Sequence, residues 1–195
     1  MRVKICGITS LEDALTAINA GAEAIGFIFY PKSPRYITPK EAKKISALLP
    51  PFVQKVGVFV NETPKCIDKT CEKAKLNLAQ LHFDVNKKFL SKLKTPYIKV
   101  VRAKQKSDVL KYEDEYRLID AFTDNFGGEG KSIDLSWFDG VDCSKIILAG
   151  GLCADMLDGI KHFGFYGVDV NSGVELSYGK KDAQKVYDFV KSAKN

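Results

Sequence analysis

The sequence predicts one α/β domain over residues 1–195, a compact (β/α)8 barrel of the TIM-barrel type. Eight short β-type apolar runs recur along the chain, and helix-type segments separate most of them. Several of these runs are apolar throughout, which is typical of parallel strands covered on both faces. An open doubly wound sheet is the alternative. The chain has no Gly-x-Gly-x-x-Gly after its first strand and no Gly-x-x-x-x-Gly-Lys-Ser/Thr, so the closed barrel is favoured.

The strands are expected where β-type apolar residues cluster between turn residues. The eight predicted strands are residues 3–6, 24–29, 53–60, 78–82, 97–102, 117–120, 145–149 and 168–171.

Helices are expected between the strands, and several carry start signals. Ser10 can cap a helix over residues 11–20, and Pro39 suits the first turn of a helix over residues 39–48. The segment 107–115 is too short for a full crossover helix, so the barrel is expected to be shortened after its fifth strand. The remaining predicted helices are residues 63–75, 85–93, 153–163 and 181–193.

Composition excludes several classes of protein. The net charge is +6, but the lysines are scattered and no basic arm or nucleic-acid motif occurs, so a solvated surface explains the charge better than nucleic-acid binding. Five cysteines without a Cys-x-x-Cys argue against a disulfide framework or a zinc site and favour a reducing cytoplasm. No signal peptide and no apolar stretch of membrane-spanning length is found, so no membrane association is expected.

Candidate catalytic residues lie where the predicted strands end, because active sites of such barrels form at the carboxyl ends of the strands. Cys6 ends the first strand, and a helix starting just beyond it would favour a thiolate; a buried core cysteine is the plain alternative. His82 ends the fourth strand, Asp120 the sixth and Asp169 lies in the eighth. Asp120 precedes a glycine-rich loop, residues 126–131. The two histidines are too few and too separate to suggest a metal site.

Two small-residue pairs, Gly150-Gly151 and Ser172-Gly173, follow the seventh and eighth strands. Barrels of this kind often bind phosphate after these strands, where backbone N–H groups are exposed and no Cβ hinders approach. Either pair alone would be explained by a tight turn, but the two together favour a phosphate site.

Eight segments, spread over nearly the whole chain, resemble the phosphoribosylanthranilate isomerases of tryptophan biosynthesis. They are residues 3–9 (VKICGIT), 26–36 (GFIFYPKSPRY), 56–61 (VGVFVN), 80–82 (QLH), 127–131 (GGEGK), 148–152 (LAGGL), 168–175 (VDVNSGVE) and 179–182 (GKKD).

The resemblance implies an isomerase without metal or organic cofactor that performs an Amadori rearrangement on N-(5-phosphoribosyl)anthranilate. It makes Cys6 the general base and Asp120 the general acid, and it places Arg35 at the anthranilate carboxylate, where a guanidinium suits the task. His82, Asp169 and Asn171 are expected to line the pocket or orient the ligand. The chain is expected to act as a monomer or homodimer.

Two alternatives stay open. The related histidine-pathway isomerase performs the same rearrangement with two aspartates, which Cys6 argues against. A barrel that only binds phosphosugars would have no need of both Cys6 and Asp120.

The reaction requires a general acid whose pKa is raised well above its usual value. A free Asp has a pKa of about 3.9, and raising it to 7 takes roughly 4 kcal/mol. Desolvation can supply part of that energy, and we expect the two anionic groups of the substrate to add to it.

Overall fold

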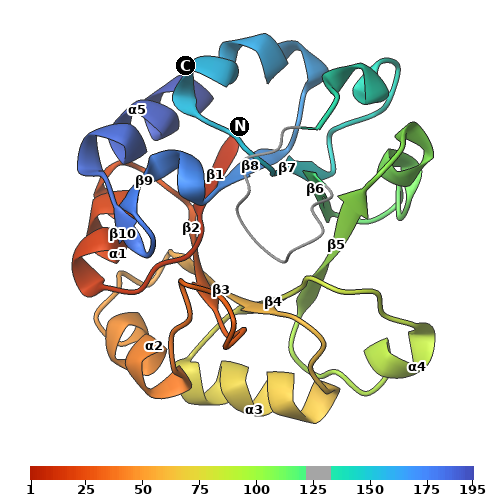
Figure 1. Ribbon diagram of the computed structural model, residues 1–195. Helices are drawn as coiled ribbons and strands as arrows, with labels where there is room; N and C mark the ends of the chain where they lie inside the picture. The colour runs from red at the N-terminus through yellow and green to blue at the C-terminus, as the bar shows by residue number, and fades with distance from the viewer. Residues whose placement is uncertain (122–132) are drawn as a thin grey trace.

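The computed structural model describes residues 1–121 and 133–195, and the predicted glycine-rich loop 126–131 lies outside the described residues. Eight strands pair in chain order and close into a barrel, and every neighbouring pair is parallel (Figure 1). The predicted barrel is therefore confirmed, and the strands differ from the predicted ranges only at their ends. They are β1 (Arg2–Ile5), β2 (Ala24–Ile28), β3 (Gln54–Phe59), β4 (Leu78–Leu81), β5 (Tyr97–Ala103), β6 (Arg117–Ala121), β7 (Ile146–Leu148) and β8 (Gly167–Val170).

Helices lie outside the ring of strands (Figure 1), and side-chain caps fix where the first three begin. The Ser10 hydroxyl accepts from the Asp13 N–H at 3.1 Å, and Thr38 forms a reciprocal capping box with Glu41. Thr63 caps the third helix, which has proline at its first turn. These helices are α1 (Leu11–Asn19), α2 (Pro39–Ser46) and α3 (Pro64–Ala74).

The second half of the barrel is less helical than predicted. After β5 a 3-10 helix, η1 (Lys106–Leu110), confirms the shortened segment. The predicted helix 85–93 is wrong in length: α4 covers only Lys87–Leu90, and Pro96 restricts the chain soon after it. The predicted helix 153–163 is also wrong. Two 3-10 helices, η3 (Ala154–Met156) and η4 (Asp158–Phe163), replace it, since its start has no side-chain cap and Gly159 disfavours an α-helix.

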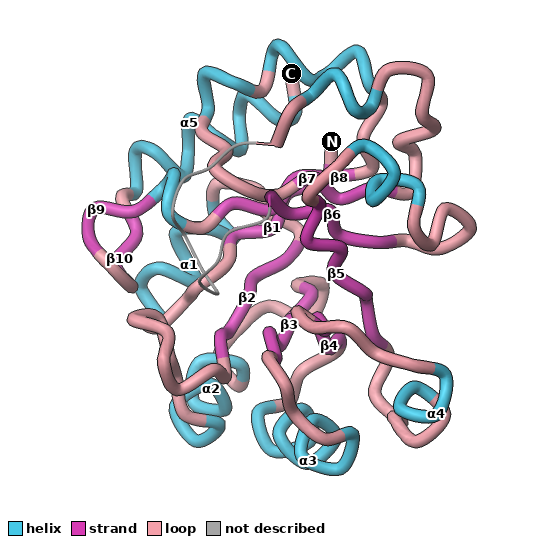
Figure 2. The backbone as a smooth tube through the Cα atoms, turned by 45° about the vertical axis from the view of Figure 1, so that its right-hand side comes forward, coloured by secondary structure: helices cyan, strands magenta, loops and turns pink. Residues whose placement is uncertain are grey.

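An antiparallel hairpin after β8 was not predicted. A short 3-10 helix, η5 (Ser172–Val174), leads into β9 (Glu175–Ser177) and β10 (Lys180–Lys181). The last helix, α5 (Ala183–Lys194), therefore begins later than predicted, at the Asp182 cap. Figure 2 shows the hairpin beside α1, and the Lys180 ammonium meets Glu12 of α1 at 2.8 Å.

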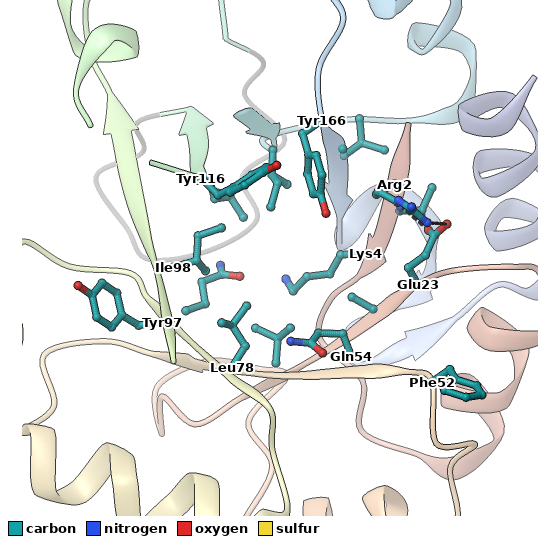
Figure 3. Close-up of a pocket in the computed structure, with 18 residues that line it drawn as sticks. Arg2, Lys4, Glu23, Phe52, Gln54, Leu78, Tyr97, Ile98, Tyr116 and Tyr166 are labelled. Atoms are coloured by element: carbon teal, nitrogen blue, oxygen red, sulfur yellow. Dashed lines mark hydrogen bonds and ion pairs between the residues drawn. The ribbon is translucent and has the colours of Figure 1, made fainter. Parts of the chain in front are cut away.

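The amino ends of the strands surround a cavity of about 450 Å³. Tyr97, Tyr116 and Tyr166 lie around it, and Lys4 extends from β1 into it (Figure 3). This cavity opens at the end of the barrel opposite to the predicted active site. Within the described residues no helix is both long and apolar enough to cross a membrane.

Candidate active site

The structure brings four predicted side chains to the carboxyl end of the barrel. Cys6 directly follows β1, His82 follows β4, Asp120 lies in β6 and Asp169 in β8. The barrel ladder still holds the first two, because the Cys6 N–H donates to the Val170 carbonyl at 2.8 Å and the His82 N–H to the Phe59 carbonyl at 2.9 Å. The sheet therefore fixes the backbone of both residues at the end of the barrel.

Cys6 lies next to a buried ion pair. Lys4 precedes it by two residues on β1, so both side chains point to the same side of the sheet. The Lys4 ammonium donates to Asp169 Oδ1 at 2.8 Å and is within hydrogen-bonding reach of the Cys6 thiol. We did not predict Lys4 as a site residue, although its period-two spacing from Cys6 was a usable signal.

Burial raises the pKa of the Cys6 thiol, and the Lys4 ammonium opposes that rise. The helix expected just beyond Cys6 is present, because α1 begins at Leu11 with Ser10 as its cap. That this helix favours a thiolate of Cys6 stays a prediction. The raised pKa makes the neutral thiol the preferred form at neutral pH, and the Lys4 ammonium favours the thiolate.

Asp120 and His82 face one another across the mouth, with 3.7 Å between Asp120 Oδ2 and His82 Nε2. Burial, followed by the charge of Asp169, raises the pKa of Asp120 to about 6. Burial, with the charges of Arg102 and Lys4, lowers the pKa of His82 to about 4. His82 is thus neutral near pH 7, while Asp120 keeps its proton in roughly one molecule in ten.

Arg35 lies in the loop after β2 and is only 2% exposed. Its Nε and Nη2 donate to the two carboxylate oxygens of Glu175 at 2.8 and 2.7 Å. Glu175 Oε1 also accepts from the Lys181 ammonium at 3.1 Å, and that ammonium donates to Asn171 Oδ1 at 3.0 Å. Glu175 and Lys181 lay inside the quoted segments, but neither was predicted as a site residue.

Of the two small-residue pairs, Gly150-Gly151 lies beside Asp120, and Gly173 of the other pair packs against Leu152. Gly150 and Gly151 have φ values of +91° and +66°, which favour glycine. A Cβ at Gly150 would lie 2.8 Å from Asp120 Oδ1, and one at Gly173 would lie 1.9 Å from the Leu152 carbonyl oxygen. The turn at Gly150-Gly151 therefore needs glycine for its backbone conformation and for close packing, whereas Gly173 is needed for close packing alone. Ser172 begins η5 beside them.

Residues 3–192 match the family model of N-(5'-phosphoribosyl)anthranilate (PRA) isomerase. The chain belongs to this family. A PRA isomerase of a Nitratiruptor species is 58% identical over 194 residues, and the match covers 100% of this chain and 99% of the relative.

Solved structures of the family have the same fold. The PRA isomerase of Thermotoga maritima is 42% identical with a TM-score of 0.89, and the match covers 100% of this chain and 98% of that one. A second structure, a PRA isomerase in complex with reduced 1-(o-carboxyphenylamino)-1-deoxyribulose 5-phosphate, is 41% identical with a TM-score of 0.85 over 100% and 98% of the chains.

The predicted site residues of this PRA isomerase family member fall into two groups. One lies around the barrel mouth and consists of Cys6, His82, Asp120, Asp169, Gly150 and Gly151. The other lies toward the hairpin, where Arg35, Asn171, Ser172 and Gly173 are found. Gly7 joins them, because a Cβ there would lie 2.4 Å from Asn171 Oδ1 and 2.9 Å from Arg35 Cδ. No group of three or more metal-ligating side chains is found among the described residues.

Proposed function

We propose that this chain converts N-(5'-phosphoribosyl)anthranilate into 1-(2-carboxyphenylamino)-1-deoxyribulose 5-phosphate, with Asp120 as general acid and Cys6 as general base. The family is that of an isomerase of tryptophan biosynthesis. The observation that carries the assignment of roles is the partly buried Asp120 carboxyl, whose pKa of about 6 leaves a protonated acid available at the barrel mouth.

The reaction needs two proton transfers at neighbouring atoms. Asp120 gives its proton to the ring oxygen of the furanose while the bond from that oxygen to C1 breaks and the nitrogen lone pair forms the imine. The Cys6 thiolate then removes the proton on C2 of the protonated imine, which gives a neutral enolamine. The enolamine takes up a proton at C1 and releases the proton of its C2 hydroxyl, and this gives the aminoketose. Atoms and electrons balance without an external oxidant or reductant, so the proposal includes no cofactor.

The remaining residues bind the substrate in this proposal. The phosphate lies at the backbone N–H groups of Gly150-Gly151 and Ser172-Gly173. Arg35 meets the anthranilate carboxylate: a guanidinium has five N–H donors, and Glu175 accepts from the one on Nε and from one of the two on Nη2. His82 and Asp169 line the pocket around the reacting carbons, and Asn171 orients the loop after β8. We also propose that the protein is cytoplasmic and that its only ligands are small molecules.

The test follows the fluorescence decay of freshly prepared phosphoribosylanthranilate with the wild-type chain, Cys6→Ser and Asp120→Asn. Loss of a general acid or base is expected to slow turnover by about 10²–10⁴-fold. Cys66→Ser on α3 and Asp158→Asn on η4 are matched controls at exposed positions and should keep wild-type rates. Full activity in either catalytic variant would remove that residue from the mechanism. If the chain turned over only the histidine-pathway substrate, the proposed reaction would be wrong and the histidine-pathway rearrangement would take its place.

A further inference from the structure

Lys4 is a buried cation that the proton transfers above do not use. It is 7% exposed, and its ammonium pairs with the equally buried Asp169. Lys4 lines the cavity at the amino ends of the strands (Figure 3), and its ammonium is also within hydrogen-bonding reach of the Cys6 thiol. Burying an ammonium and a carboxylate is costly even when they are paired, so the pair calls for a role beyond stability.

Lys4 and Cys6 occupy one common space above Gly26 of β2. A Cβ at Gly26 would lie 2.7 Å from Cys6 Sγ and 3.1 Å from Lys4 Cε. Any larger residue at this position would push into both side chains. Glycine here therefore lets the cation and the thiol lie side by side inside the barrel.

We propose that Lys4 is a positioning residue that stabilises the thiolate of Cys6, and that Asp169 limits this effect by sharing the same ammonium. The inference rests on the proposed role of Cys6 as the base. Lys4 is not assigned a contact with substrate. Its function is to balance the negative charge that the thiol acquires when it loses its proton.

The charges around Cys6 support opposite effects of the two partners. The ammonium of Lys4 lowers the pKa of the thiol, and the carboxylate of Asp169 raises it. Lys181 from β10 adds a second, weaker lowering. Asp120 of β6, His82 directly after β4 and Arg102 of β5 face the same mouth. Because Lys4 and Asp169 act in opposite directions on the pKa of the Cys6 thiol, replacing each of them should shift this pKa in opposite directions.

The experiment titrates the thiolate of Cys6 by its ultraviolet absorbance, taken as the difference between each variant and the same variant carrying Cys6→Ser. Lys4→Met should move the titration up by about 1–3 pH units, whereas Asp169→Asn should move it down by a comparable amount. Lys4→Arg keeps the charge and should stay close to the wild type. A residue with only a packing role would shift the titration in neither direction.

Lys99→Met is the matched control, since Lys99 is also buried, at 8% exposure, and its ammonium also pairs with one carboxylate at 2.8 Å, that of Glu115. It should leave the Cys6 titration unchanged. If a single variant fails to fold, Lys4→Met combined with Asp169→Asn removes both charges and leaves no unpaired ion. The double variant should titrate below Lys4→Met and above Asp169→Asn, so it can be compared with whichever single variant folds.

The pH profile of kcat/KM gives a second reading. In Lys4→Met the alkaline limit should move up and the rate at neutral pH should fall by about tenfold or more. An unmoved titration in folded Lys4→Met would overturn the inference even if Cys6→Ser abolishes activity. Conversely, an active Cys6→Ser enzyme together with opposite shifts in the two single variants would refute Cys6 as the base and leave the charge coupling in place.

Discussion

Glu175 holds Arg35 by two hydrogen bonds of 2.8 and 2.7 Å, and both side chains are almost completely buried. The same carboxylate accepts from the Lys181 ammonium at 3.1 Å and from the Gly179 N–H at 3.2 Å. One anion from β9 therefore neutralises two buried cations. It fixes the loop after β2, which carries Arg35, to the hairpin at the end of the chain.

Glu175→Gln should destabilise the protein strongly, because it leaves Arg35 and Lys181 buried without their anion. We expect the free energy of unfolding to fall by about 3–5 kcal/mol in urea titrations. Asp158→Asn, which breaks an exposed ion pair with Lys161, should cost no more than about 1 kcal/mol. Equal effects of the two variants would show that the buried cluster contributes little to stability.

Gly173→Ala should damage the proposed phosphate site. The new Cβ would lie 1.9 Å from the Leu152 carbonyl oxygen, so the two loops after β7 and β8 must move apart. We expect KM for the substrate to rise at least about tenfold, because moving these loops displaces the backbone N–H groups that bind the phosphate. Gly159→Ala is the control, because its Cβ would meet no atom within 4 Å. A normal KM in folded Gly173→Ala would argue against phosphate binding at this turn.

The pH profile of kcat/KM should be a plateau between about 6, the pKa of Asp120, and the raised pKa of Cys6. The productive form needs a protonated Asp120 and a thiolate, and both are minority states in this window. As the pH rises, the share of protonated Asp120 falls as fast as the share of thiolate grows, so their product stays constant. Below this window kcat/KM should fall, because the share of thiolate decreases while Asp120 is already fully protonated. Above the window kcat/KM should fall again, because the share of protonated Asp120 decreases while Cys6 is already fully ionised.

Asp120→Asn separates this reading from titration of the substrate phosphate, whose second pKa is also about 6. The residual activity of the variant should rise with pH up to the pKa of Cys6, since only the thiolate share then changes. A residual activity that keeps the wild-type plateau would show that the lower limit belongs to the substrate and that Asp120 is not the acid.

The sequence allowed the barrel to be predicted because its strands are apolar runs bounded by glycine and polar turns. The segment 153–163 was not predictable as 3-10 helix, since its apolar spacing suits either helix type. Cys6 and Asp120 followed from the rule that strand ends form the site. Lys4 and Glu175 did not, because their roles depend on partners 165 and 140 residues away along the chain. The raised pKa of Cys6 also depends on burial, which local sequence does not reveal.

Asp120→Asn should stabilise the folded protein at high pH while it removes activity. The pKa of Asp120 is raised from 3.8 to about 6 by folding. Between these values the folded chain binds more protons than the unfolded chain, so the free energy of unfolding falls as the pH rises through this window. Above pH 6 the whole penalty is present, and at pH 4 it is nearly absent.

Asparagine cannot ionise and can still accept the hydrogen bond that Asp120 receives from the Ala121 backbone. We expect urea titrations to show a gain of about 1–3 kcal/mol at pH 8 and almost none at pH 4. A gain of the same size at both pH values would assign the effect to packing rather than to the buried charge. A loss at pH 8 would mean that the carboxylate is stabilised by its surroundings, which would leave no protonated acid for the reaction.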